Sequence, residues 1–559
     1  MDRLLRVINR EWSGLHEAAF LLAGTALLSQ ALGLVRDRML ASTFGASDAL
    51  DIYYAAFRVP DFLYASVASF VAVTVLIPFL LDRMQHDKDG ASARKFIDSV
   101  FTAFALVMIV TCGIAYVFMP TLAEYIVPGF NPLAHEEFVT LSRLLLLSPL
   151  LLGMSNLLGA VTQSLRRFFV FAAGPILYNI GIIIGIVFFL PKYGLSGVVY
   201  GVLLGALMHV MVQLPVLVAE GIVPRFTLHI DWSIVRAITK LSIPRTIALS
   251  ATHLATMVLI ALASQIEEGS IAVFIFAMNL QSIPLSIVGM SYSVAAFPTL
   301  ARLWTGGNKD EFMEQISTAT RHIMFWSFPA IVLFIVLRAQ IVRTILGSGA
   351  FDWTATRLTA AALALFAISV VAQNLVLLYT RSFYAMGKTR TPLIANVTGA
   401  VIVVASTYLL LALFRNEPTF RFFSESLLRV ADTPGTSVLM LPLGYSLGML
   451  ANVFLLLHFM RKVSPGFGGS IHKAFLHSFT TSVVMGFVVY HGLQVFSGIF
   501  DLDTFSGIFY QGAASGAIGI LAGIFLLRLM ENTELEEVRT SLHHKFWKSK
   551  PIASEQESL

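Results

Sequence analysis

The residues of this sequence best suited to chemistry are charged side chains that lie within or beside apolar stretches. Arg36, Asp51 and Arg58 fall in or next to the first two of these stretches. An ionisable group in contact with lipid is strongly unfavourable, so such a group is expected to face a cavity and to serve a function. An arginine there suits a phosphate or pyrophosphate, because its planar guanidinium donates two charge-assisted hydrogen bonds at once. The pattern predicts a binding site for an anionic group.

The sequence lacks the patterns expected of enzymes and metal sites. It has no nucleotide-binding loop, no nucleophile paired with a base and no carboxylate pair spaced for hydrolysis, so we expect no catalytic residues and no cofactor. A single cysteine, Cys112, excludes an intrachain disulfide and a cysteine-based metal site. His209 and Gln213 share one face of a predicted helix, but the sequence places no third ligand near them, so no metal site is expected.

The stretches that carry these residues are those of a membrane protein. Of the 559 residues, 57% are hydrophobic and only 13% are charged, with a mean hydropathy of +0.78, whereas about 25% of the residues of a soluble domain are charged. The apolar residues come in runs of roughly 20, the length of a membrane-spanning helix. Backbone groups in lipid must bond within a helix or a closed barrel, and the strict alternation of barrel strands is absent. The sequence therefore predicts an all-α integral membrane protein.

Fourteen apolar runs are long enough to be transmembrane helices. Lys and Arg should be in excess in cytoplasmic loops. With the N-terminus inside, and with residues near the ends of a run counted in the adjoining loop, 27 of the 38 Lys and Arg residues fall in cytoplasmic segments and 9 fall outside. Arg58 and Arg143 lie within spans. Both termini are therefore expected in the cytoplasm, and the net charge of +5 follows from this topology without a nucleic-acid partner. The runs are 17–35, 52–81, 97–119, 138–162, 168–190, 194–219, 242–265, 271–300, 321–346, 356–380, 390–414, 437–460, 474–496 and 505–529.

Two parts of the chain resemble each other at a nearly constant offset. The matched pairs, 218, 217 and 220 residues apart, are Asn156 with Asn374, Asn179 with Asn396, and Pro78 with Pro298. Six helices separate the copies, so both have the same orientation in the membrane. Such parallel repeats are typical of transporters with a central site between two lobes. The expected parts are a cytoplasmic interfacial helix (1–16), an N-lobe (17–219), a cytoplasmic linker (220–241), a C-lobe (242–462), helices 13 and 14 (463–530) and a cytoplasmic tail (531–559).

Several short motifs resemble those of one transporter family. The first two predicted helices contain L-S-Q-A-L-G-L-V-R-D at 28–37, F-G-A at 44–46 and D-A-L-D-I-Y-Y-A-A-F-R-V-P at 48–60. F-P-T-L at 297–300 and T-R-T-P at 389–392 give further support. With these motifs the chain resembles the lipid II flippase family MurJ (MviN), within the multidrug/oligosaccharidyl-lipid/polysaccharide exporter superfamily. The fourteen predicted helices and the duplication extend the resemblance over nearly the whole chain.

This resemblance implies a transporter that flips a lipid-linked peptidoglycan precursor across the bacterial cytoplasmic membrane by alternating access. The expected partners are a polyprenyl-pyrophosphate-linked sugar and membrane lipids, while coupling ions and the membrane potential both stay open as driving forces. The family has two lobes in a V around a cationic cavity, and its last two helices form a groove for the polyprenyl tail. Arg36 matches a functional arginine of the family, Asp51 a functional acidic residue and Arg58 a position that is usually basic.

Three departures from the family pattern imply a cavity that is less basic than usual. Gln30 stands where the family often has arginine, and Tyr64 and Ala65 stand where it has a basic pair. Asn279 occupies a position of helix 8 that usually holds arginine. We expect Asn279 and Gln281 to face the arginine of the first helix and to serve as neutral substitutes for the missing one.

Other functions stay open beside the lipid II flippase. The chain could flip another polyprenyl-linked glycan, export drugs by cation coupling, or act as a non-transporting scaffold for envelope assembly. The loss of family basic positions keeps the scaffold under consideration. Drug exporters of the superfamily usually have twelve helices and bind cationic substrates through intramembrane carboxylates. Between 242 and 302 the only acids are Glu267 and Glu268, in a short outer loop, which favours the flippase.

Overall fold

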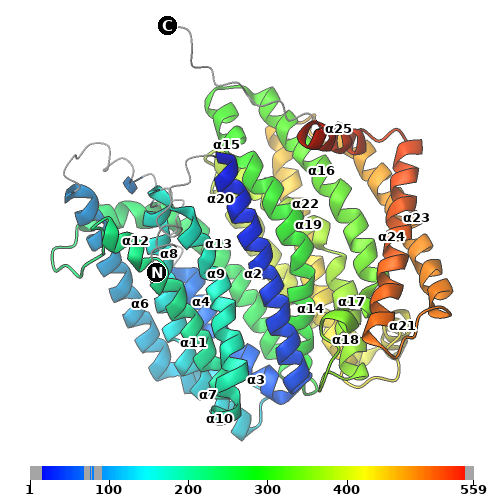
Figure 1. The fold of residues 1–559 in the computed structure, drawn as a ribbon, viewed down its shortest axis with the longest axis horizontal. Helices are drawn as coiled ribbons and strands as arrows, with labels where there is room; N and C mark the ends of the chain where they lie inside the picture. The colour runs from blue at the N-terminus through cyan, green and yellow to red at the C-terminus, as the bar shows by residue number, and fades with distance from the viewer. Residues whose placement is uncertain (1–14, 68–75, 77–78, 81–90, 166, 548–559) are drawn as a thin grey trace. The chain divides into compact units, whose positions relative to one another are not determined.

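The computed structural model of the chain is helical, and its described residues contain no β-strand (Figure 1). The structure describes the chain except residues 1–14, 68–75, 77–78, 81–90, 166 and 548–559. The predicted all-α fold is confirmed. The interfacial helix expected at 1–16 falls almost entirely outside the described residues.

Eleven helices within the described ranges are long and apolar enough to cross a membrane, or twelve if one bent pair is a single span. The predicted number of fourteen is consistent with this count but stays a prediction, since part of the expected span 52–81 is not described. The helices up to the middle of the chain are α2 (Leu15–Phe44), α3 (Asp48–Ala56), α4 (Arg58–Val67), α6 (Ala91–Ile126), α7 (Pro132–Leu145), α8 (Leu147–Ser164), α9 (Phe168–Ile184), α10 (Leu190–Tyr193), α11 (Leu195–Met211) and α12 (Leu214–Ala219).

The second part of the chain continues with helices of similar lengths. They are α13 (Trp232–Ala263), α14 (Ser270–Pro284), α15 (Ser291–Thr305), α16 (Lys309–Val336), α17 (Arg338–Ile345), α18 (Trp353–Ala367), α19 (Val370–Ala385), α20 (Arg390–Asn416), α21 (Pro418–Leu428), α22 (Met440–Val463), α23 (Gly469–Ser497), α24 (Phe505–Leu529) and α25 (Thr533–Trp547). Wider π-helical turns continue α9 at Gly185–Phe189 and α14 at Leu285–Met290. Such turns change the direction of a helix locally and are frequent at functional sites.

The described helices group into two compact units. The first unit contains residues 1–280, 345–366 and 389–452, and the second contains 281–344, 367–388 and 453–559. The first unit includes α2 to α13, the start of α14, and α20. The second includes α15, α16, α19 and the last three helices, with α23 packed on both α16 and α24. The division into two six-helix lobes and a pair of added helices stays a prediction.

Equivalent helices of the two sequence copies make equivalent pairs. In the first unit α2 packs on α9, and α13 packs on α20 (Figure 1). In the same way, α6 packs on α8 in the first unit, and α16 packs on α19 in the second. Since these helices correspond at an offset of about 220 residues, the repeated pairing supports the internal duplication.

Two glycine loops repeat this correspondence within the first unit. The N–H of Gly129 donates to Oγ of Ser264 at 3.2 Å, and the N–H of Ala350 donates to the carbonyl of Ser42 at 2.8 Å. A Cβ on Gly129 would lie 1.9 Å from the Ser264 carbonyl oxygen, and one on Gly349 would lie 2.3 Å from that of Ser42. The two glycines are 220 residues apart and the two serines 222. Each copy thus docks a glycine loop on the first helix of the other copy.

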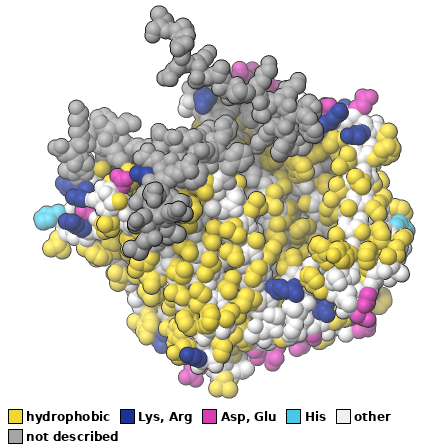
Figure 2. Space-filling model, viewed as in Figure 1, with side chains coloured by type: hydrophobic (Ala, Val, Ile, Leu, Met, Phe, Trp, Pro, Cys, Tyr) yellow, Lys and Arg dark blue, Asp and Glu magenta, His cyan; other side chains and the backbone are white. Residues whose placement is uncertain are grey.

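The face of the described helices that Figure 2 shows is largely apolar. Figure 2 shows hydrophobic side chains covering the region of α2, α9 and α11. Exposed residues there include Leu27 on α2, Phe188 at the end of α9 and Met211 on α11, at 62%, 63% and 51%. A surface of this kind is stable in contact with lipid, in agreement with the membrane assignment.

The C-terminal segment is a helix bound to the second unit. Glu534 of α25 lies 3.3 Å from Nη1 of Arg321, and Oε2 of Glu537 lies 2.8 Å from Nε2 of His322. The side chain of Glu534 is only 3% exposed. The start of α25 is therefore bound to α16, near the middle of that helix.

Candidate functional site

Arg36 lies on α2 with its guanidinium bonded on two sides. Its Nε and Nη2 donate to Oδ1 of Asp37 at 2.9 and 2.8 Å, and its Nη1 donates to Oδ1 of Asn179 at 3.1 Å. The side chain of Arg36 is 23% exposed, whereas that of Asp37 is only 6% exposed. Asp37 therefore balances the charge of Arg36, while part of the arginine stays accessible.

Asn179 on α9 holds the guanidinium from the second side. Its Nδ2 donates to the carbonyl and Oγ of Ser29, both at 3.3 Å, and to the carbonyl of Pro175 at 3.0 Å. With its amide nitrogen bonded to α2 and to its own helix, its Oδ1 faces Arg36. The sequence analysis selected Asn179 only through its match with Asn396.

The duplicated asparagine of the second copy has a different partner. Oδ1 of Asn396 on α20 accepts from Nδ2 of Asn452 on α22 at 2.9 Å. The two equivalent amides thus bond to an arginine in the first copy and to another amide in the second. Of the two equivalent asparagines, only Asn179 in the first copy is bonded to an arginine.

Asn279 joins the network from α14. Its Nδ2 donates to Oδ2 of Asp37 at 3.1 Å, so both oxygens of this carboxylate are bonded. Gln281, two residues further on, is 2% exposed, and its Oε1 accepts from Nε2 of Gln373 at 2.9 Å. Of the two amides expected to replace the family arginine, Asn279 is therefore the one bonded to the network.

Asp51 binds the start of a helix, whereas the sequence predicted that it faces a binding cavity. Its carboxylate is 3% exposed and accepts from the N–H groups of Gly269 and Ala272 at 2.9 and 2.8 Å. These groups lie at the start of α14, where N–H groups lack partners within the helix and the helix dipole favours a negative charge. Asp51 therefore fixes the start of the helix that carries Asn279. The acid bonded to Arg36 is Asp37, which the sequence analysis did not select.

Arg58 lies at the start of α4 in a smaller polar group. Its Nε donates to the carbonyl of Tyr54 at 3.1 Å, and its Nη2 is 3.9 Å from Oδ2 of Asp61. The side chain of Arg58 is 13% exposed and that of Asp61 is 44% exposed. A pair this long and partly solvated is weak. Arg58 is thus less firmly neutralised than Arg36.

The positions that depart from the family pattern carry neutral, half-buried side chains. Gln30 lies on α2, and Tyr64 and Ala65 lie on α4. Oη of Tyr64 accepts from Nδ2 of Asn156 at 2.6 Å, and its ring packs against an apolar cluster of α4, α6 and α8. Tyr64 thus makes one hydrogen bond and apolar contacts at a position where a basic residue is usual in the family.

His209 and Gln213 bond to a third side chain on α8. Nδ1 of His209 lies 2.5 Å from Oγ of Ser155, and Nε2 of Gln213 donates to the Ser155 carbonyl at 3.1 Å. A Cβ on Gly174 would lie 2.5 Å from Nε2 of His209, so the imidazole needs a glycine opposite it. Throughout the described residues, no three His, Cys, Asp or Glu side chains are grouped so that they could hold a metal.

Comparisons with known proteins agree with the fold and with the family resemblance of the sequence. The model of the family described as "Lipid II flippase MurJ" matches residues 40–510. The probable lipid II flippase MurJ of Rickettsia prowazekii is 27% identical over 441 residues, which cover 78% of this chain and 83% of the relative. The lipid II flippase MurJ of Burkholderia cenocepacia is 24% identical over 406 residues, covering 71% and 79%.

Solved structures give the same result for the fold. A structure titled "Lipid II flippase MurJ, inward closed conformation" is similar with a TM-score of 0.72 and 20% identity, covering 93% of this chain and all of that one. An inward-facing multidrug resistance transporter of the MATE family is similar with a TM-score of 0.62 and 15% identity, covering 78% and 95%. Identities this low show a shared fold, and function has to be argued from the site.

Proposed function

Because the chain belongs to the lipid II flippase MurJ family, we propose that it carries lipid II across the cytoplasmic membrane and binds its pyrophosphate mainly through Arg36. The supporting observation is a partly accessible guanidinium, held within the helices by one carboxylate and one amide. A pyrophosphate brings about two negative charges into the cavity, and these need cationic partners in a space of low dielectric constant. Arg36 supplies one partner, and Arg58 supplies a second.

Asp37 occupies the guanidinium until the substrate arrives. It accepts from two of the guanidinium nitrogens, Nε and Nη2 of Arg36. A pyrophosphate that binds in bidentate fashion needs a pair of parallel N–H donors, so it competes with Asp37 for them. Asn279 continues to hold the released carboxylate through Oδ2. Asp51 acts through the start of α14, which keeps Asn279 in place.

The last helices are proposed to hold the polyprenyl tail. In the second unit α23 and α24 pack on each other (Figure 1). Large apolar side chains on both helices are exposed, among them Phe487 at 66% and Leu521 at 66%. A flexible hydrocarbon chain could lie on such a surface without meeting a charge. We also propose that the cavity opens alternately to the two sides of the membrane and that both termini are cytoplasmic. Transport would be coupled to an ion or to the membrane potential.

Drug export receives less support from the site. The acids of the second copy that the sequence offers for cation export, Glu267 and Glu268, are exposed in the loop between α13 and α14. The buried acids Asp37 and Asp51 are already engaged, by Arg36 and Asn279 and by the start of α14. The similarity to the MATE transporter concerns the fold alone.

The test is transport of a fluorescent polyprenyl-pyrophosphate lipid across liposome bilayers. We expect Arg36→Ala to abolish flipping and Arg36→Lys to restore only part of it, because a point charge lacks the fork of the guanidinium. Arg38→Ala is the matched control, since Arg38 lies on the same helix but donates to the carbonyl of Ile345 at 3.2 Å. Normal flipping by a folded Arg36→Ala protein would contradict the proposed headgroup site.

A further inference from the structure

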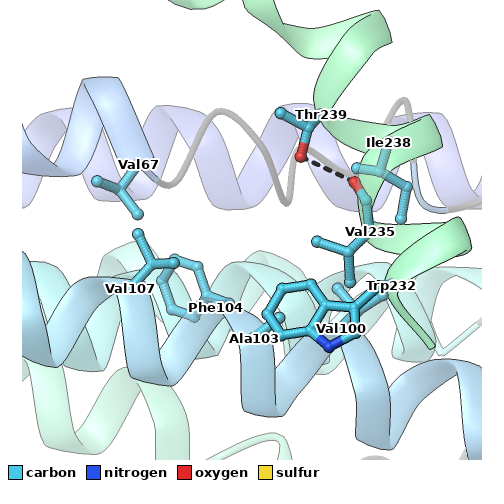
Figure 3. A pocket seen from close by; sticks show the side chains of 9 residues that line it. All are labelled: Val67, Val100, Ala103, Phe104, Val107, Trp232, Val235, Ile238 and Thr239. Atoms are coloured by element: carbon cyan, nitrogen blue, oxygen red, sulfur yellow. Dashed lines mark hydrogen bonds between the residues drawn. The ribbon is translucent and has the colours of Figure 1, made fainter. Parts of the chain in front are cut away.

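An apolar pocket, whose lining does not include Arg36, lies between α4, α6 and the start of α13. This inner pocket has a volume of about 200 Å³ and is lined by Val67 of α4, Ala103, Phe104 and Val107 of α6, and Trp232 and Val235 of α13. Figure 3 shows the side chains of α6 and α13 facing each other across it. The proposed headgroup site does not use this pocket.

The lining of the inner pocket is almost entirely apolar and therefore favours a hydrocarbon chain as its ligand. Its polar lining residue, Thr239, donates its hydroxyl to the carbonyl of Val235 at 2.8 Å, as the dashed line in Figure 3 marks. The volume of about 200 Å³ exceeds the roughly 150 Å³ of an apolar cavity that admits benzene. It falls short of the ~300 Å³ at which sites for drug-sized ligands begin. The pocket therefore fits a segment of a flexible chain and not a whole rigid molecule.

The inner pocket opens toward the lipid-facing side of α6. Val107 lines the pocket and is itself 44% exposed. It begins a stripe of exposed apolar side chains at helical spacing that continues with Val110, Ile114 and Val117, at 52%, 55% and 66%. In a membrane protein this stripe contacts the acyl chains of the bilayer. A chain that enters the pocket thus comes from a neighbouring lipid.

Two cationic side chains lie on the exposed surface of α13, about 100° around the helix from the pocket residues that precede them. Arg236 and Lys240 are exposed and directly follow the lining residues Val235 and Thr239 in sequence. Trp232, 62% exposed, has the amphipathic character of residues at a membrane surface. These features suit the phosphate of a lipid headgroup.

The one acid at the start of α13 is engaged in capping that helix. Asp231 accepts from the N–H groups of Ser233 and Ile234 at 3.1 and 3.4 Å and from the Ser233 hydroxyl at 2.6 Å. The positive charge of Lys95 on α6 also acts on its carboxylate. The carboxylate of Asp231 is therefore engaged with the start of its own helix, and no hydrogen bond joins it to Arg236 or Lys240 among the described contacts.

We propose that the inner pocket binds one acyl chain of an anionic phospholipid whose phosphate is held by Arg236 and Lys240. The pocket has walls from α4 and α6 of the first sequence copy and from the start of α13, the helix that leads into the second copy. A seated acyl chain fills the space between them and stabilises the arrangement in which α13 lies against α4 and α6. The lipid is a ligand of the protein in addition to the transported one.

The test uses quenching of Trp232 by phospholipids with brominated acyl chains. The full-length protein is placed in mixed micelles with brominated phosphatidylglycerol or brominated phosphatidylcholine. The signal of Trp232 is the difference between the wild type and Trp232→Phe, since the chain has 6 tryptophans. We expect its quenching to saturate with phosphatidylglycerol at about tenfold or more lower concentration than with phosphatidylcholine, because each basic side chain near a headgroup favours the anion.

Two sets of variants separate the acyl-chain pocket from ordinary lipid contact. Ala103→Phe fills the pocket and should remove the saturable quenching, whereas Ile114→Phe on the exposed stripe of the same helix should leave it. Arg236→Gln combined with Lys240→Gln changes only exposed positions and should remove the preference for phosphatidylglycerol. Quenching that rises in proportion to the brominated lipid, that ignores Ala103→Phe, or that is equal for both headgroups would overturn the proposal. This assay measures binding and is independent of transport.

Discussion

A double-mutant cycle on Arg36 and Asp37 separates the role of this pair in stability from its role in transport. The three variants are Arg36→Ala, Asp37→Ala and the protein with both changes. Each single change leaves one charge without its partner among packed helices. The double change removes both charges together.

The structure allows the size of the effect to be estimated. Breaking a buried ion pair by removing one partner costs about 3–5 kcal/mol, and the 23% exposure of Arg36 places this pair near the lower end. The double change also loses one bond each from Asn179 and Asn279, at roughly 1 kcal/mol apiece. It should therefore cost about 2 kcal/mol, where the sum of the single changes is about 6 kcal/mol.

Stability is followed by the apparent melting temperature in detergent, and transport by flipping of a labelled pyrophosphate lipid in liposomes. We expect the double variant to melt above both single variants, yet to flip no more lipid than Arg36→Ala. Additive losses of stability would show that the two charges are not coupled. A double variant that flips normally would show that Arg36 serves structure alone.

Three further predictions concern other parts of the fold. Asn279→Arg should tighten the binding of pyrophosphate lipid in nanodiscs, because a second cation beside the α2 carboxylate frees the first one for the substrate; unchanged affinity would contradict this. Gly129→Ala and Gly349→Ala should each lower thermal stability by roughly 1–3 kcal/mol, since the new methyl group meets a carbonyl of another helix, whereas Gly113→Ala, with no atom within 4 Å, should not. The pKa of Asp231 is lowered, first by the neighbouring serine hydroxyl and then by backbone N–H groups, so its contribution to stability is complete above the usual aspartate pKa and is lost as the pH falls through the lowered value. Asp231→Asn should flatten this part of a plot of melting temperature against pH.

The sequence predicted the features of the fold that depend on hydrophobicity and repetition. Apolar runs of roughly 20 residues must be helices in lipid, so the all-α membrane fold followed from composition and spacing. The offset of about 220 residues, found from a few polar matches such as Asn156 with Asn374, recurs in the pairing of helices and in the two glycine loops. Arg36 could be selected because a charge in or directly beside such a run is unfavourable in lipid and is expected to serve a function.

The residues that bond to Arg36 could not be predicted from their spacing in the sequence. Neighbouring residues of a helix do not face each other, so the direct succession of Arg36 and Asp37 argues against a pair. The long arginine side chain nevertheless turns back to its neighbour. Asp51 could not be recognised as a cap because this requires the position of a helix start 218 residues away. Asn279 and Gln281, two residues apart, are rotated by about 200° on a helix and cannot both face one site.

An amide at position 279 suits the proposed headgroup site, because that site contains few cations. A network of Arg36 and Asp37 alone is neutral, so a pyrophosphate gains a full positive charge only when Asp37 releases the guanidinium. Asn279 retains the carboxylate through Oδ2 by a neutral donor and does not attract the substrate away from Arg36. Arg58, whose distance to Asp61 is 3.9 Å, is then available as the second cation. In the proposed mechanism, a less basic cavity holds the substrate by exchange of one anion for another, which favours release as much as binding and suits a carrier that must let its lipid go.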